Sequence, residues 1–374
     1  MKTVSFQNIG WTLGNDCPCQ CKHCYSFDVR KNGADLTKEL ADRVLSQIYK
    51  LPVRTVNIGG NEPIFTSGLN AGKSLLPYIL EQLHKKGIEV GITTSGISLV
   101  KMKELFPDSL ALLNDVDISL DSPYASEHNE NRGSNTFHYA IEALEICREH
   151  CIHSGIILCA MNWNFTVDRL EKMIELAKQY QATIRINLLK PVEKRHFGLM
   201  PSPEQVQTGY KYLFEYCDVI DLSEPTLART AGHQTVQGCS CGTNSMRINS
   251  ITPDGKIMIS PCVYMHDFRV GDLLTEDILD IVASKPFQDF AYRKENYQMI
   301  PGCLDCSCAD ICRGGCFAMA YTYMKGGNGT ADLFARDPYC TKELQVGALD
   351  ARFASGEHNL VHQNYLCTCI LRPR

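Results

Sequence analysis

The chain has 374 residues, a length that fits two globular domains. Its formal net charge of -5 leaves no basic excess, which argues against nucleic acid as its main partner. We find no apolar run long enough to cross a bilayer, and the first ten residues lack the apolar segment of a signal peptide. The 19 cysteines do not fit a short secreted disulfide scaffold, so we expect a cytoplasmic protein that uses its thiols to bind metal.

The first half of the sequence alternates between short apolar strands and amphipathic helices. The alternation predicts about six βα units and therefore a parallel sheet. In parallel α/β folds the chemistry lies at the carboxyl ends of the strands, and the motifs below follow strands. The expected strands are 5–13, 55–58, 88–93, 116–120, 156–159 and 183–189, and the expected helices start after an N-cap at Thr37 and cover 75–86, 135–150 and 167–180.

Three cysteines follow the first expected strand at the spacing Cys-x3-Cys-x2-Cys. Three thiolates can hold three irons of a 4Fe-4S cluster and leave the fourth iron open for a ligand. Cys19 is an extra thiol in this loop, and we expect it to point away from the cluster. The loop from Cys17 to Cys24, which reads Cys-Pro-Cys-Gln-Cys-Lys-His-Cys and contains Cys21, resembles the motif of the radical S-adenosylmethionine (SAM) enzymes.

A glycine pair and a glutamate follow the second expected strand. Glycines let a ligand approach the backbone closely, and a carboxylate accepts hydrogen bonds from an ammonium. Alone, such a pair indicates a turn. After the cysteine triad, the segment resembles the Gly-Gly-Glu-Pro motif that binds the amino group of SAM, with one asparagine inserted. We expect Glu62 rather than Asn61 to accept from that amino group. The segment is Gly59, Gly60, Asn61, Glu62 and Pro63.

Polar side chains also follow the third and fourth expected strands. Ser95 follows the third strand, Ser119 and Asp121 follow the fourth, and Arg132 comes soon after. The resemblance implies that Ser119 and Asp121 bind the carboxylate and ribose of SAM, and Ser95 and Arg132 are further candidates. The alternative is that these hydroxyls and carboxylates cap the helices that follow.

The second half of the sequence concentrates cysteines. A connecting helix is expected over 203–216, and the segment 252–256 reads as a hairpin turn before Cys262. Farther on, cysteines recur at the spacing Cys-x2-Cys-x5-Cys-x3-Cys, and one more follows near residue 340. This arrangement resembles the SPASM domain, which holds auxiliary iron-sulfur clusters. The cysteines that carry the resemblance are Cys239, Cys241, Cys262, Cys303, Cys306, Cys312, Cys316 and Cys340.

The resemblance implies two auxiliary 4Fe-4S clusters. One would be ligated by Cys303, Cys306, Cys312 and Cys340. The other would be ligated by Cys241, Cys262 and Cys316, with Cys239 as the candidate for the fourth ligand. Because one residue separates Cys239 from Cys241, three thiolates and an open iron are an alternative for this second cluster. Thiolates at these spacings also suit zinc, but the N-terminal triad favours iron and sulfide.

The remaining cysteines have simpler expectations. Cys147, Cys151, Cys159, Cys217 and Cys308 are expected to be small buried hydrophobic residues. The pair Cys367 and Cys369 could fold back onto a cluster, but a frayed end is the expected state.

The resemblance implies an α/β fold with a partial (β/α)6 barrel over residues 1–200. A linker and connecting helix follow over 201–237, a SPASM domain over 238–345 and a C-terminal tail over 346–374. The implied cofactors are a 4Fe-4S cluster that binds SAM, two auxiliary 4Fe-4S clusters, and SAM itself. The implied reaction begins with a 5′-deoxyadenosyl radical that removes a hydrogen atom from the substrate. The sequence singles out no catalytic side chain.

The implied substrate is a ribosomally synthesised precursor peptide. The segment Gly-Gly-Asn-Glu-Pro-Ile-Phe-Thr resembles that of maturases whose peptides carry nitrile-hydratase-like or related leaders. Some of these maturases are spliceases, which excise tyramine at a Tyr-Gly site and leave an α-keto-β-amino acid. The alternatives are thioether or carbon–carbon crosslinking, epimerisation, maturation of a small cofactor, and a multi-cluster electron carrier, which would have no need of six βα units. A separate leader-binding protein is expected, since the motif begins at Cys17, together with a flavodoxin or ferredoxin as electron donor. Neither nucleic acid nor membrane is expected as a partner.

Overall fold

Six parallel strands form the centre of the sheet, as the alternation in the sequence predicts. The computed structural model describes residues 6–27, 30, 33–232, 234–330, 332–356, 358–363 and 365–374. Within them the parallel strands pair in chain order, so that each βα unit places its strand beside the previous one. These strands are β1 (Asn8–Trp11), β2 (Thr55–Ile58), β3 (Glu89–Thr94), β4 (Asp115–Ser119), β5 (His153–Ala160) and β6 (Thr183–Leu188).

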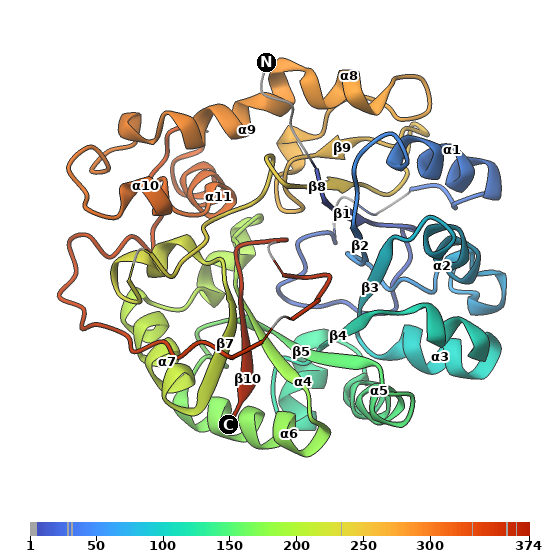
Figure 1. The fold of residues 1–374 in the computed structure, drawn as a ribbon, viewed down its shortest axis with the longest axis horizontal. Coiled ribbons are helices and arrows are strands. Elements are labelled where there is room, and N and C mark those ends of the chain that lie inside the picture. Colours follow the sequence, from blue (N-terminus) through green and yellow to red (C-terminus); the bar gives the residue numbers. More distant parts are fainter. Residues whose placement is uncertain are drawn as a thin grey trace.

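Helices cover the outer, convex side of this curved sheet (Figure 1). Thr37 caps the first of them, because its hydroxyl accepts from the backbone N–H of Leu40 at 3.3 Å. The sequence did not predict α3 and α4, since α3 has no amphipathic stripe and α4 is polar on nearly every side. The helices are α1 (Lys38–Ile48), α2 (Leu76–His84), α3 (Ile97–Leu105), α4 (Ala125–Arg132), α5 (Phe137–Glu149), α6 (Val167–Tyr180) and α7 (Pro203–Tyr216).

Four further strands extend the sheet on both sides. On one side β8 (Ser245–Ile248) runs parallel to β1, and β9 (Ile259–Ser260) pairs with β8 antiparallel. On the other side β10 (Cys369–Pro373) lies between β6 and β7 (Cys217–Leu222) and is antiparallel to both. The expectation of a frayed end is therefore wrong for the described C-terminal residues. The full order is β7-β10-β6-β5-β4-β3-β2-β1-β8-β9.

The cysteine-rich half adds short helices around a chain rich in turns. The expected turn at 252–256 is present, closed by a hydrogen bond from the Thr252 N–H to the Lys256 carbonyl at 2.9 Å. Cys262 lies two residues after the end of β9. The helices here are α8 (Ile278–Ala283), α9 (Lys285–Glu295), α10 (Ala309–Cys312) and α11 (Phe317–Asn328). Within the described chain, no helix combines the length and the apolar character that crossing a membrane requires.

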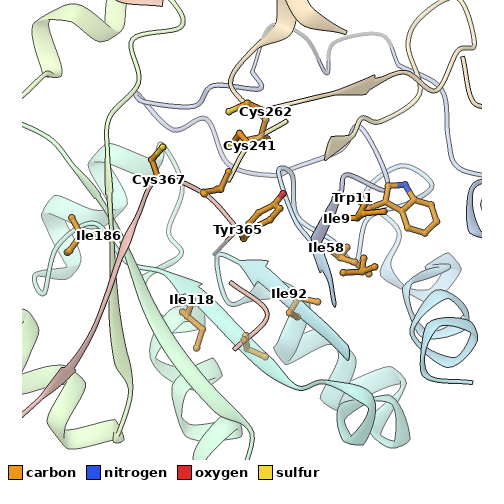
Figure 2. Packing of buried hydrophobic residues seen from close by; sticks show 14 of the residues in the cluster. Ile9, Trp11, Ile58, Ile92, Ile118, Ile186, Cys241, Cys262, Tyr365 and Cys367 are labelled. Carbon is orange, nitrogen blue, oxygen red and sulfur yellow. The ribbon is translucent and has the colours of Figure 1, made fainter. Parts of the chain in front are cut away.

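Residues 358–363 and 365–368 run along the concave side of the sheet before β10, and we call them the inner segment (Figure 1). His362 is buried there, with its Nδ1 3.3 Å from a carboxylate oxygen of Asp115. Tyr365 points toward the strand that carries Ile9 and Trp11 (Figure 2). The intervening Gly10 makes room for it, because a Cβ at that position would lie 1.7 Å from the Tyr365 hydroxyl oxygen.

Candidate functional site

A cavity of about 160 Å³ lies where the loops after the parallel strands meet. This is the end of the sheet at which parallel α/β folds carry out chemistry. Gly59 and Pro63, which adjoin lining residues in the sequence, and Asp121, two residues after Ser119, do not line the cavity. The other predicted residues of the N-terminal half do, namely Cys17, Cys21, Cys24, Gly60, Asn61, Glu62, Ser95, Ser119 and Arg132.

The cysteine loop is anchored to the end of α4. The backbone N–H of Gln20 donates to the Arg132 carbonyl, and that of Lys22 donates to the Asn131 carbonyl, both at 2.9 Å. The expectation that Cys19 points away is wrong. Its side chain is buried and lines the cavity, and its thiol lies next to those of the flanking triad members Cys17 and Cys21. The loop therefore gathers four thiols around one space.

Asp121 and Arg132 form a buried ion pair behind the cysteine loop. Nε of Arg132 lies 2.6 Å from Asp121 Oδ2, and its Nη1 lies 3.7 Å from the Cys21 sulfur. Burial alone would raise the pKa of Asp121, but the charge and hydrogen bond of Arg132, together with the neighbouring His23 and His128, hold that pKa well below its usual value. Burial lowers the pKa of neighbouring His23 to about 4, so its imidazole is neutral at neutral pH. The pair thus places a fixed positive charge beside a triad thiol.

Glu62 is buried at the rim of the cavity, and its carboxylate accepts five hydrogen bonds from within the chain. The donors are the hydroxyls of Thr94, Ser95 and Ser98 and the backbone N–H groups of Ser95 and Ser98. These donors surround the start of α3, where a carboxylate is favourable. Asn61 is also engaged, since its amide donates to the Gly14 carbonyl at 2.6 Å. Both side chains therefore shape the loop that lines the cavity.

The glycine pair allows the backbone to approach its neighbours closely. Gly60 has a φ of 101°, and a Cβ there would lie 2.6 Å from the Thr12 hydroxyl oxygen. The carbonyl of Gly59 accepts from the guanidinium of Arg247, which comes from β8. An interpretation of the pair as a simple turn is therefore incomplete, because its backbone lies close to Thr12, just after β1, and to Arg247 of β8.

The sequence did not single out three other side chains of the cavity, Asn187, Lys190 and Tyr264. Lys190 is 3% exposed, and its ammonium lies 5.6 Å from the ring centroid of Tyr264, which follows β9. Burial alone would lower the pKa of Lys190, but Cys316 and other nearby acidic groups raise it well above its usual value. A cation thus lies between the cavity and the cysteine-rich half. The only signal in the sequence that Lys190 belongs to this site was its position two residues after the end of β6.

A second group of thiols lines one cavity in the cysteine-rich half. All four cysteines implied by the resemblance are there, namely Cys303, Cys306, Cys312 and Cys340. Cys308 joins them, with its sulfur 3.6 Å from that of Cys306, so its role is not only that of a buried hydrophobic residue. The guanidinium of Arg336 donates to the Cys340 sulfur at 3.4 Å.

A third group lies between the sheet and the cysteine-rich half. The thiol of Cys241 lies next to those of Cys239 and Cys262. The thiol of Cys367 lies next to those of Cys239 and Cys316. This group therefore contains the four predicted cysteines and one from the inner segment. Lys294 of α9 supports it, because its ammonium donates to the Cys239 carbonyl at 2.7 Å and also to the carbonyl of Cys241.

These three groups fit iron-sulfur clusters by their donors, since each gathers at least four unpaired thiols. Among the described residues, no three Cys, His, Asp or Glu side chains converge closely enough for a single metal ion, so the fit rests on the donor set and the shared spaces. Burial raises the pKa of Cys147 and of Cys217 to about 12, as suits the expected hydrophobic role. Cys151 is exposed and Cys159 half-buried, so the same expectation is wrong for them.

Comparison with known proteins agrees with this arrangement. The model of the radical SAM superfamily matches residues 11–190, and that of the SPASM iron-sulfur cluster-binding domain matches residues 239–307. The mycofactocin maturase MftC of Mycolicibacterium smegmatis is 26% identical over 369 residues, which is 94% of this chain and 88% of that protein.

Two solved structures share the fold. Streptococcus suis SuiB bound to its precursor peptide SuiA has a TM-score of 0.62 at 15% identity, over 90% of this chain and 76% of that one. The anSMEcpe protein with bound AdoMet and a peptide has a TM-score of 0.65 at 17% identity, over 90% and 94% of the two chains. The chain is therefore a radical SAM enzyme with a SPASM iron-sulfur domain, and it binds SAM and iron-sulfur clusters.

Proposed function

We propose that this enzyme modifies a ribosomally synthesised precursor peptide. One observation carries the proposal: the cavity behind the cysteine loop is also lined by Lys190 and Tyr264, which border the third group of thiols. A substrate held there would lie between the SAM site and an auxiliary cluster. The similarity to MftC over 94% of the chain and the fold shared with peptide-bound SuiB and anSMEcpe support a peptide as that substrate.

We infer the following roles for the residues around the cavity. When bound, the N-terminal cluster and SAM supply a 5′-deoxyadenosyl radical that removes a hydrogen atom from the peptide. Cys17, Cys21 and Cys24 would hold that cluster, and the backbone of the Gly59–Pro63 loop would hold SAM, with Ser119 in reach of it. The ammonium of Lys190, almost fully buried, is suited to bind a carbonyl or carboxylate of the peptide.

The specific reaction that we propose to test is tyramine excision at a Tyr-Gly site. Its support is the segment from Gly59 to Thr66, which reads Gly-Gly-Asn-Glu-Pro-Ile-Phe-Thr. We also propose a separate leader-binding protein and a flavodoxin or ferredoxin that delivers single electrons. A cytoplasmic location would keep the 19 thiols reduced and available to iron.

The test is anaerobic incubation of the enzyme with SAM, a reductant, and the precursor peptide encoded beside its gene, followed by mass spectrometry. Excision predicts a product lighter by the tyramine unit, with a ketone that a hydrazine reagent traps. A loss of two hydrogens indicates a crosslink. An unchanged mass in ordinary water, with deuterium uptake when the reaction runs in heavy water, indicates epimerisation. Either result would support peptide modification and contradict splicing.

The control is the triple variant Cys17→Ala, Cys21→Ala and Cys24→Ala, which should leave the peptide unchanged. If the native enzyme cleaves SAM but alters no candidate peptide, with or without the leader-binding protein, the proposal of a peptide substrate is wrong. A small cofactor would then be the class of substrate to test.

A further inference from the structure

We propose that Cys367 of the inner segment is a ligand of the auxiliary cluster at the third group of thiols, and that Cys239 is not. The SPASM pattern ends at Cys340, so it does not include this cysteine. The group contains five thiols, whereas a 4Fe-4S cluster has four irons to be ligated. The question is therefore which thiol stays outside the cluster.

Burial separates the five thiols into four and one. Cys241 is 2% exposed, and Cys262, Cys316 and Cys367 are each 4% exposed. Cys239 is only half-buried, and it lines a groove on the outside of the molecule together with polar residues such as Ser240 and Thr243. The four least exposed residues of the group thus include Cys367 and leave out Cys239.

The position of Cys367 within the group also favours ligation. Its thiol lies next to those of Cys239 and Cys316. Figure 2 shows Cys241 and Cys262 close to each other, with Cys367 at the end of β10 facing the same region. A cluster bound among these four thiols would contact three separate parts of the chain. Cys239 belongs to the same short segment as Cys241, two residues away, and its residue is the more exposed of the two.

The backbone on both sides of Cys367 is fixed. On one side the Ser245 hydroxyl donates to the Tyr365 carbonyl at 2.7 Å. On the other side the Thr368 hydroxyl donates to the Ile186 carbonyl, and the Ser223 N–H donates to the Thr368 carbonyl, both at 2.9 Å. A ligand held by such contacts is already in place before the cluster binds, which lowers the entropic cost of binding.

Ligation by Cys367 replaces the S–H bond of its thiol with a bond from sulfur to iron. Its S–H bond breaks, the proton leaves to solvent, and the thiolate sulfur forms a bond to one iron with no change of oxidation state. The bond would tie the inner segment, which runs along the concave side of the sheet, directly to the auxiliary cluster.

The experiment compares three single variants of the holoenzyme, prepared and reduced anaerobically. Iron and sulfide are counted, and electron paramagnetic resonance records the auxiliary clusters. Cys367→Ala should lower the iron content by the share of one cluster or change one auxiliary signal, whereas Cys239→Ala should match the wild type. Cys369→Ala is the matched control, because this buried cysteine lies two residues away and outside the group of thiols.

Wild-type iron content and signals in Cys367→Ala, or their loss in Cys239→Ala, would overturn the proposal. If Cys367→Ala does not fold, Cys367→Ser supplies an oxygen ligand of similar size, and we expect it to retain the cluster with a shifted signal. If neither folds, Cys239→Ala decides alone: an unchanged spectrum supports the proposal and a changed one contradicts it.

Discussion

The carboxylate of Glu62 illustrates how a side chain can matter to a site by holding the backbone around it. All five of its donors belong to Thr94, Ser95 and Ser98, at the start of α3. Two of them are backbone N–H groups at a helix N-terminus, which lack partners within the helix. Glu62 therefore joins the loop after β2 to the helix after β3, and both border the cavity.

We predict that the main effect of Glu62→Gln is a lower stability of the holoenzyme, and that its effect on the intrinsic affinity for SAM is smaller. The amide NH2 cannot accept from the buried N–H groups that the carboxylate serves, and each buried donor left without a partner costs about 1–3 kcal/mol. The melting temperature should fall, while Glu81→Gln, on the exposed side of α2, should leave it unchanged. A ten- to hundredfold weaker SAM affinity at unchanged melting temperature, roughly what loss of one charge-assisted bond gives, would mean that Glu62 binds the amino group directly.

The sequence predicted the chemical role of single residues wherever those residues belong to a short motif. The members of the triad lie within a short loop and those of the glycine pair are adjacent, and most of these residues line the cavity. The positions of Cys19 and Lys190 could not be predicted from the sequence. Cys19 faces the cavity because its loop is anchored to the end of α4, which is more than 100 residues away in the sequence. Lys190 is paired with an aromatic ring from the other half of the chain.

Among the elements, β1 and the inner segment depend on each other. Gly10 lies in the middle of β1, and a Cβ there would meet the Tyr365 hydroxyl at 1.7 Å and the Arg247 guanidinium at 2.6 Å. The space beside β1 is therefore shaped for the inner segment, and the absence of a side chain at this position is a structural requirement.

We predict that Gly10→Ala destabilises the protein by about 1–3 kcal/mol through overpacking. Removing the clashing oxygen with Tyr365→Phe should recover part of this loss in the double variant, as measured by chemical unfolding. Gly327→Ala in α11 is the matched control, since a Cβ there meets nothing within 4 Å. Equal stability of Gly10→Ala and the wild type would show that the inner segment does not occupy this space.

The parallel strands were predictable because each is a short apolar run followed by a helix. Strands β7 and β10 were not, because their stability depends on each other and on β6. β7 is buried along its whole length although it contains Asp218 and Asp221, and β10 ends in Arg372 and Pro373, so neither has the composition of a typical strand. Pairing between segments so distant in sequence leaves no local pattern.

At the scale of the whole molecule, 14 of the 19 thiols fall into three groups that share no members. The N-terminal loop supplies one, and the cysteine-rich half supplies the other two with help from the inner segment. The sequence led us to expect three such groups, with Cys19, Cys308 and Cys367 outside them, whereas the structure places one of these three cysteines beside each group.

We therefore predict that the triple variant Cys17→Ala, Cys21→Ala and Cys24→Ala loses SAM cleavage but keeps the auxiliary clusters. Its iron content should fall by about one cluster, and it should form no 5′-deoxyadenosine under reducing conditions. Cys151→Ala, which changes an exposed thiol, should retain both properties of the wild type. Loss of all iron from the triple variant would mean that the three sites assemble cooperatively.

The place of β10 in the sheet has a consequence for biosynthesis. A chain emerges from the ribosome in order, and residues 189–368 separate β6 from the strand that pairs with it. At a translation rate of about 5–20 residues per second, the edge of β6 stays unpaired for roughly 10–40 s until β10 has been synthesised. During translation this buried strand is thus an open template for other nascent chains, and a chaperone that covers it would raise the yield of enzyme that is competent to receive its clusters.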